Sequence, residues 1–319
     1  MLRIISSLKL ERTIHWWFEQ FSKGLWTHTK VDLRGNQIAT IDGGILHRIL
    51  NEFSQGDGFL NLEECGRIGN TIAKPQRLVR GGKAAAPGAW PWQVAIYDAQ
   101  VEYIICGGAL IGKGGSKYIF DPRWSNVPRC LQVIQIFVHD EYTGFESDIA
   151  LMKLHGSANL TKRVQLICLP SNDDLSDDFL DGSQDEFGGP HRGWVAGWGK
   201  DASDEGTDAL TEVQLTVTPK RECRNRIRMK TSDHPASITR NTFCAGERNN
   251  ASSFVNEDAK EYGTVCEGDS GSPMVFPSHS LLKSQWVVEG IVSHIYVKSR
   301  QDCSNYEPGQ YGVFTRVNK

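Results

Sequence analysis

No long apolar run occurs in this chain, although 39% of its 319 residues are hydrophobic. Because a membrane-spanning helix needs about 20 consecutive apolar residues, the sequence predicts a packed core and no transmembrane helix. An excess of one charge is also lacking, since 35 Lys and Arg face 38 Asp and Glu and the net charge is −3. We therefore expect no bulk attraction to nucleic acid. Residues 1–12 are interrupted by charge and do not match a good signal peptide.

A complete metal-binding pattern is missing as well. Acidic residues and Asn61 within residues 57–64 hint at a calcium loop, but their spacing fails the full pattern. A single turn resembling a leucine-rich repeat, at residues 31–38, cannot bury its own face. We therefore expect no metal and no cofactor. The aromatic-rich stretch at residues 14–26 fits a short amphipathic helix.

Eight cysteines favour an oxidising, extracellular compartment. Their number alone does not fix how they pair. Glycosylation sequons begin at Asn159 and Asn250, which agrees with secretion, although such triplets are common by chance. The expected localisation is therefore secreted.

The most informative feature is the octapeptide at residues 266–273, which reads C-E-G-D-S-G-S-P. Acyl transfer by a serine needs a nucleophilic hydroxyl, a base that takes its proton, and donors for the developing oxyanion. Ser270 is the candidate nucleophile, and the backbone N–H groups of Gly268 and Ser270 are the candidate oxyanion donors. Gly268 lets the chain turn because it has no Cβ. The alternative is a surface turn with an ordinary serine, and the rest of the chain decides between the two.

Further segments occur in matching order. The octapeptide resembles C-x-G-D-S-G-[GS]-P, the nucleophile loop of the chymotrypsin/trypsin-like serine proteases, and D-I-A-L at residues 148–151 resembles the segment with their catalytic Asp. The resemblance covers about residues 78–319. It also rests on P-G-A-W-P-W-Q-V at 87–94, C-G-G-A-L-I at 106–111, V-Q-L-I-C-L-P at 164–170, V-A-G-W-G at 195–199, F-C-A-G at 243–246 and Y-G-V-F-T-R-V at 311–317.

The resemblance implies an all-β fold, a trypsin-like double six-stranded β-barrel whose first barrel is incomplete. Alternating or apolar runs independently predict strands, at residues 92–97, 103–111, 132–138, 210–218 and 286–295. The chain divides into an uncharacterised N-terminal remnant at 1–64, an activation segment or linker at 65–77, and a trypsin-like serine protease domain at 78–319. The basic stretch 220–230 favours a charged helix face over a polyanion patch, and the acidic run 172–186 favours a solvated loop over a cation or basic-partner site.

One family segment is absent: no T-A-A-H-C, the piece with the catalytic His, follows residues 106–111. Only 42 positions separate Cys106 from Asp148, fewer than relatives use. His139 is nearest to Asp148 in sequence, and the resemblance makes it an ordinary surface residue at a strand end. His294 follows Ser293 close to the substrate cleft. We expect neither to replace the general base.

The resemblance assigns the remaining site residues. Asp148 is the catalytic Asp, and Asp269 is the activation-pocket residue that pairs with a new N-terminal ammonium after cleavage. That cleavage falls after Arg77 or Arg80, and the resulting N-terminus is out of step with the usual [IV]-[VI]-G-G. An arginine in that segment is costly in a dry pocket unless it is paired.

The implied substrate-binding residues are Thr264, Ser293, Ile295 and Gly312. Thr264 stands where relatives that select Arg or Lys carry Asp, and Ile295 narrows the mouth of the pocket. The implied disulfides are Cys65–Cys168, Cys223–Cys244 and Cys266–Cys303. Cys106 loses its usual partner with the missing segment, so a Cys106–Cys130 bond and two thiols remain open alternatives.

The implied function is that of a serine endopeptidase domain from a secreted zymogen of a clotting- or complement-type cascade, with protein substrates or cascade proteins as partners. This chain is expected to be inactive, because loss of a triad member lowers turnover by roughly 10⁴- to 10⁶-fold. The alternatives are a non-catalytic homologue that acts as a binding or adaptor module, and a product without a stable fold. The sequence leaves the substrate and the oligomeric state open.

Overall fold

The computed structural model describes part of the chain and is all-β, with a single helix among the described residues. No helix of this part is long and apolar enough to cross a membrane. Four features named above lie outside the described residues: the helix expected at 14–26, the calcium-like stretch 57–64, the acidic run 172–186 and the sequon asparagines Asn159 and Asn250. The described residues are 3–6, 37–41, 65–68, 83–98, 103–111, 133–144, 146–154, 160–170, 191–200, 209–230, 238–246, 263–278, 285–295 and 311–317.

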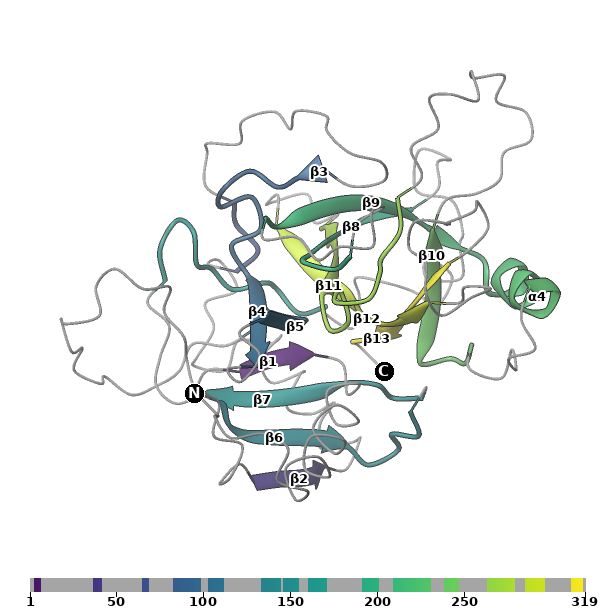
Figure 1. Ribbon diagram of the computed structural model, residues 1–319, viewed down its shortest axis with the longest axis horizontal. Helices are drawn as coiled ribbons and strands as arrows, with labels where there is room; N and C mark the ends of the chain where they lie inside the picture. Colours follow the sequence, from purple (N-terminus) through teal and green to yellow (C-terminus); the bar gives the residue numbers. More distant parts are fainter. Residues whose placement is uncertain are drawn as a thin grey trace.

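The first sheet has six strands in the order β2-β6-β7-β1-β5-β4, and no pairing among the described residues joins its two ends. It is therefore an open counterpart of the first barrel, as predicted. Figure 1 shows it as the lower left part of the molecule. Its strands are β1 (Arg3–Ser6), β2 (Gln37–Ile41), β4 (Gln93–Asp98), β5 (Tyr103–Leu110), β6 (Val133–His139) and β7 (Ala150–Leu154).

The second sheet closes on itself. Its order is β10-β13-β12-β11-β8-β9-β3, and β9 also pairs with β10, so six of the seven strands form a closed barrel. Closure removes the exposed edges that an open sheet would leave. The strands are β3 (Lys83–Ala84), β8 (Arg192–Gly197), β9 (Thr211–Thr218), β10 (Thr242–Gly246), β11 (Pro273–Pro277), β12 (Trp286–Ile295) and β13 (Gly312–Arg316).

The helix α4 (Lys220–Lys230) lies at the outer margin of this barrel (Figure 1). It confirms the helix predicted from the basic stretch. Its buried Cys223 forms a disulfide with Cys244 of β10, and Ile227 packs into the same buried cluster. Arg221 is exposed and places its charge in solvent as expected. Arg224 is also largely exposed, but its guanidinium Nε donates to the carbonyl of Ile238 at 3.1 Å.

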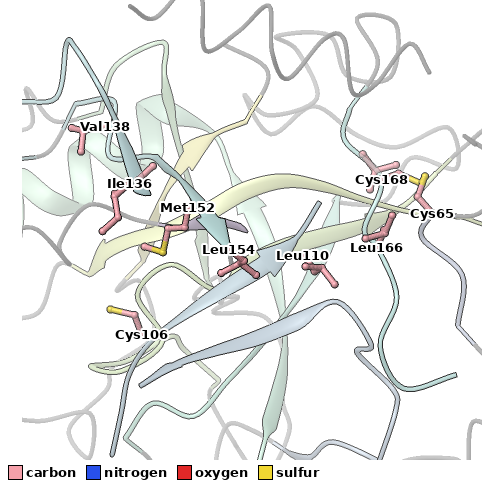
Figure 2. Packing of buried hydrophobic residues seen from close by; sticks show 11 residues of the cluster. Cys65, Cys106, Leu110, Ile136, Val138, Met152, Leu154, Leu166 and Cys168 are labelled. Atoms are coloured by element: carbon pink, nitrogen blue, oxygen red, sulfur yellow. A yellow bond between two sulfur atoms is a disulfide. The ribbon is translucent and has the colours of Figure 1, made fainter. Parts of the chain in front are cut away.

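Two residues that precede the protease-like segments in the sequence are bonded to the core of the molecule. Cys65 forms the predicted disulfide with Cys168, and the neighbouring Gly66 donates its N–H to Leu166 and accepts one from Trp286. In Figure 2 this disulfide lies at one end of the buried cluster that continues through Leu110, Leu154 and Met152.

A tryptophan cluster joins the two halves. The ring of Trp90, which precedes β4, lies 5.4 Å from that of Trp286 and 5.9 Å from that of Trp194, measured between centroids. Its indole Nε1–H donates to Glu212 Oε2 at 2.6 Å, which satisfies the polar end of a largely apolar ring. The segment that leads into β4 of the first sheet is thus packed against β8, β9 and β12 of the barrel.

Candidate active site

The loop that carries Ser270 is fixed by backbone hydrogen bonds from both sheets. Gly107 of β5 donates its N–H to the carbonyl of Ser270 at 2.8 Å, and Gly271 donates to Val292 of β12 at 2.8 Å. Within the loop, Asp269 donates to Cys266 at 3.0 Å. The nucleophile candidate therefore lies where the first sheet and the barrel meet.

The two candidate oxyanion donors are left available. Asp269 and Ser272 donate their N–H groups within the loop and Gly271 donates to Val292 of β12, whereas those of Gly268 and Ser270 donate to none of the described groups. Gly268 has φ of +100°, which few residues with a Cβ adopt, and an added Cβ would meet the Cα of Gly199 at 2.9 Å. The backbone is therefore arranged to leave donors facing the site.

Asp269 has its carboxyl group turned into the protein, although part of the residue remains accessible to solvent. Its Oδ1 accepts the N–H of Gly199 and its Oδ2 that of Cys266, each at 2.8 Å. A Cβ at Gly197 would lie 2.0 Å from Oδ1, so the carboxyl fits only because glycine is there. Loss of hydration raises the pKa of Asp269 from 3.8 to about 6, against the two hydrogen bonds, which lower it.

Asp148 is fully buried and is reached from β12. Ser293 Oγ donates to Asp148 Oδ2 at 2.5 Å. The pairing of β12 with β13 shifts register between Val292 and His294, so Ser293 sits in a β-bulge, a device that re-aims a side chain. This contact joins two predicted site residues, and the bulge that makes it gave no signal in the sequence.

The backbone before Asp148 is unusual. Ser147 has φ of +51°, the left-handed region, and is 2% exposed, and its carbonyl accepts the N–H of Ile149 at 2.8 Å. Such a conformation in a non-glycine residue is maintained by its surroundings and is found often at functional sites. It sets the course of the backbone at Asp148, two residues before β7 begins.

Three histidines lie in the part of the chain that the structure describes, and the structure places one of them next to Asp148's partner. His294 Nδ1 is 3.0 Å from Ser293 Oγ. Because that hydroxyl gives its only proton to Asp148, the imidazole nitrogen is the donor in this contact. Among the described groups, no imidazole hydrogen-bonds Ser270 Oγ.

The expectation for His139 was wrong in one respect. His139 ends β6 as predicted, but it is buried, 7% exposed, not a surface residue. Its Nδ1 accepts the N–H of Glu141 at 3.1 Å and lies 3.2 Å from Asp140 Oδ1. This ring is held by the turn that follows β6. His191, the third described histidine, is also buried and precedes β8.

The predicted pocket residues come from neighbouring strands. Ile295 of β12 pairs with Gly312 of β13, and Ser293 lies two residues earlier. A Cβ at Gly312 would meet Val265 Cγ2 at 2.7 Å, which places the segment of Thr264 against the same strand. Thr264 is half-buried, and its hydroxyl donates to the carbonyl of Val265 at 3.2 Å. Their role in binding a substrate remains a prediction.

The cysteine framework agrees with the resemblance where it is described. Cys65–Cys168 and Cys223–Cys244 are present, and Cys266 is disulfide-bonded. Cys303 and Cys130 lie outside the described residues. Cys106 is a buried thiol, which decides against a Cys106–Cys130 bond. The cleavage sites at Arg77 and Arg80 also lie outside the described part.

No group of three or more metal-ligating side chains occurs among the described residues. The arrangement offers a serine, backbone donors and a buried carboxylate, which suits acyl transfer by a serine and needs only a base to complete it.

The closed barrel, its open partner sheet and the serine loop between them are the architecture of the trypsin-like serine protease family. The family model "Trypsin" matches residues 124–319, and the chain belongs to this family. The chain is similar to Limulus clotting factor C of Carcinoscorpius rotundicauda and to clotting factor C of Tachypleus tridentatus. In each case the match is 28% identical over 287 residues and covers 80% of this chain but 25% of the relative. The chain thus spans about a quarter of the length of these relatives.

Proposed function

We propose that this chain is a secreted trypsin-family domain of the proteolytic-cascade type that does not hydrolyse peptides in its present form. The proposal is carried by one observation: the site has a serine loop and a buried carboxylate, but no described histidine is hydrogen-bonded to the serine. The N–H groups of Gly268 and Ser270 donate to none of the described groups, and the buried Asp148 accepts from Ser293 Oγ at its Oδ2. No described imidazole bonds the Ser270 hydroxyl, and the family's histidine segment is missing from the sequence.

The chemistry of acyl transfer explains why a serine loop without a general base is inactive. A serine hydroxyl attacks a carbonyl only when a base removes its proton. In the family that base is held by the catalytic Asp. Ser293 Oγ occupies only Oδ2 of Asp148, so the group that is lacking is the imidazole itself, and no described imidazole hydrogen-bonds the Ser270 hydroxyl. The oxyanion donors alone leave a small residual effect, and turnover is expected to fall by roughly 10⁴- to 10⁶-fold.

The cascade role rests on two features. Clotting factor C is the name of both relatives. The Cys65–Cys168 disulfide would keep the segment before the domain attached after a cut at Arg77 or Arg80. Disulfides and secretion agree, because structural disulfides persist in oxidising compartments. Glycosylation at Asn159 and Asn250 belongs to the same proposal.

A fluorophosphonate probe tests the proposal, because it reacts only with an activated serine. The full chain, before and after cleavage at Arg77 or Arg80, is compared with a Ser270→Ala variant, and trypsin serves as the positive control. We expect labelling of the chain no faster than that of Ser270→Ala. Stoichiometric labelling at Ser270 would overturn the proposal and would show that another group acts as the base.

A second candidate is a binding module that retains the substrate cleft. It is favoured by the unused N–H groups of Gly268 and Ser270, since they can still donate hydrogen bonds to a peptide carbonyl oxygen. Thr264 and Ile295 would select partners other than Arg or Lys side chains. Calorimetric titration with a protein inhibitor of trypsin-like proteases checks this: binding that survives in Ser270→Ala supports the module, and no heat of binding contradicts it.

A further inference from the structure

The strand in the middle of the first sheet comes from outside the protease pattern. β1 (Arg3–Ser6) lies between β5 and β7, which do not pair with each other among the described residues. The family match begins at residue 124 and the resemblance at about residue 78, so both flanking strands belong to the protease domain and β1 does not. Figure 1 shows β1 in purple between its two neighbours.

The pairing is continuous on both sides of β1. On one side Arg3, Ile4, Ile5 and Ser6 face the β7 residues Lys153, Met152, Leu151 and Ala150. On the other side Ile4 faces Leu110 and Ile5 faces Ala109 of β5. All pairs are antiparallel, so four residues are held as a central strand and not as an edge.

The neighbouring strands need this partner. Ala109 and Leu110 on β5 and Ala150, Leu151 and Met152 on β7 are buried. With β1 removed, the backbones of β5 and β7 would stand two strand spacings apart, about 9 to 10 Å. Their facing N–H and C=O groups would then lose the strand that pairs with them, whereas backbone groups in the interior of native proteins are almost always paired. The sequence R-I-I-S suits the position because β-branched residues favour strands and no proline interrupts it.

We propose that the gap between β5 and β7 is a strand-binding site whose ligand is the chain's own segment Arg3–Ser6. The segment stays bound when the chain is cut between the N-terminal region and the protease domain. This binding is strand addition to a sheet, in which main-chain hydrogen bonds supply the affinity. The N-terminal region thereby becomes a permanent part of the first sheet and not an appendage that cleavage releases.

A disulfide also attaches the N-terminal region to the protease domain. Between β1 and the start of β3 at Lys83 the chain has a second anchor, the Cys65–Cys168 disulfide. A cut between Ile68 and Lys83 thus leaves the N-terminal fragment held by the disulfide and by strand pairing. β2 adds parallel pairing with β6, from Gln37 opposite Gln135 to Ile41 opposite His139.

The test removes the covalent link and asks whether pairing suffices. In the full chain, Cys65→Ser and Cys168→Ser remove the disulfide, and a recognition site for a sequence-specific protease is placed between Ile68 and Lys83. After the cut we expect the fragment to elute with the protease domain in native size-exclusion chromatography. Adding Ile4→Pro and Ile5→Pro removes two strand N–H donors and should release the fragment at least about tenfold faster.

The matched control carries Arg12→Pro and Thr13→Pro, outside the strand, and should behave like the unaltered chain. β2 is present in every variant, so the comparison isolates β1. Immediate loss of the fragment after the cut, or equal retention of the strand and control variants, overturns the proposal.

A crosslink keeps the proposal testable if the proline variants do not fold. In the full chain, Ile4→Cys with Leu110→Cys places two cysteines directly opposite each other across the strand pair. Peptide mapping should find this disulfide in more than about half of the molecules. Ile4→Cys with Ala109→Cys is one position out of register and serves as control. Equal yields for the two pairs, or no crosslink in either, overturn the proposal.

Discussion

Asp148 and Asp269 are both turned into the protein, yet they meet different partners. Asp148 accepts the hydroxyl of Ser293, which keeps its own proton. Asp269 accepts two backbone N–H groups, from Gly199 and Cys266. Neither contact brings a positive charge to the carboxylate, so at Asp269 the loss of hydration outweighs the hydrogen bonds and the pKa rises.

The raised pKa of Asp269 makes stability depend on pH in a defined direction. In the folded chain the carboxyl holds its proton up to about pH 6, whereas its ordinary pKa is 3.8. The stabilisation from this group is therefore complete below about pH 4 and is lost as the pH rises through about 6. Since one unit of pKa shift equals about 1.4 kcal/mol, the loss is on the order of a few kcal/mol.

Urea unfolding between pH 4 and 7 measures this dependence. Asp269→Asn stays neutral throughout, so its free energy of unfolding should fall less over this range than that of the unaltered chain. Glu267→Gln, in the same loop but exposed, is the control for removing a carboxylate. The expectation is wrong if the two variants follow the same course with pH.

At the residue scale, sequence motifs named the candidate site residues but did not give the contacts between them. Ser270, Asp269, Asp148 and Ser293 were all named from motifs, because each motif keeps its local spacing. The Ser293–Asp148 hydrogen bond joins residues 145 positions apart and depends on a bulge in β12, and neither property leaves a local pattern. The burial of His139 was missed because the strand end was expected to face solvent.

At the level of elements, the serine loop depends on glycines placed at tight points. Gly268→Ala would force a side chain into φ of +100° and push its Cβ to 2.9 Å from the Cα of Gly199. We expect the free energy of unfolding to fall by about 1–3 kcal/mol, the usual cost of such backbone strain.

Gly88→Ala is a suitable comparison for that variant. Gly88 also has positive φ, +82°, but its added Cβ meets a flexible Arg163 side chain at 3.3 Å. The difference between the variants in urea unfolding therefore measures the contact with the Gly199 backbone. Equal losses would mean that backbone strain alone accounts for the effect and that the close approach to Gly199 contributes nothing.

The strands of the protease domain could be predicted because each carries its own signal. The structure has β12 at Trp286–Ile295, as predicted, and β9 at Thr211–Thr218, one residue shorter at its start. β1 and β2 could not be predicted, since a stretch such as R-I-I-S is too short to show a period. Only the vacancy between β5 and β7, a property of the folded chain, explains why these residues form a strand.

At the scale of the molecule, the two described disulfides close loops of different length. The Cys65–Cys168 bond spans 103 positions and the Cys223–Cys244 bond spans 21. In the chain-entropy account these loops are worth about 4.7 and about 3.3 kcal/mol. Replacing both cysteines of the longer loop by serine should therefore cost more than doing so for the shorter loop, by about 1.4 kcal/mol.

Urea unfolding of the two double variants, with the remaining disulfides intact, gives both costs directly. Each variant serves as the control for the other, because both replace a buried cysteine pair by serines. The reverse order, with the shorter loop worth more, would contradict the loop-length argument.

The hydrogen bond from Gly107 to the carbonyl of Ser270 crosses from the open sheet to the serine loop. An amide proton exchanges with solvent only when its hydrogen bond opens. The exchange rate of the Gly107 amide therefore reports how often the first sheet and the barrel separate. The amide of Gly271 is hydrogen-bonded to Val292 of β12, so its exchange rate reports opening at the barrel alone. If Gly107 exchanges faster than Gly271, the halves separate while the barrel stays shut, and the serine loop then remains with the barrel.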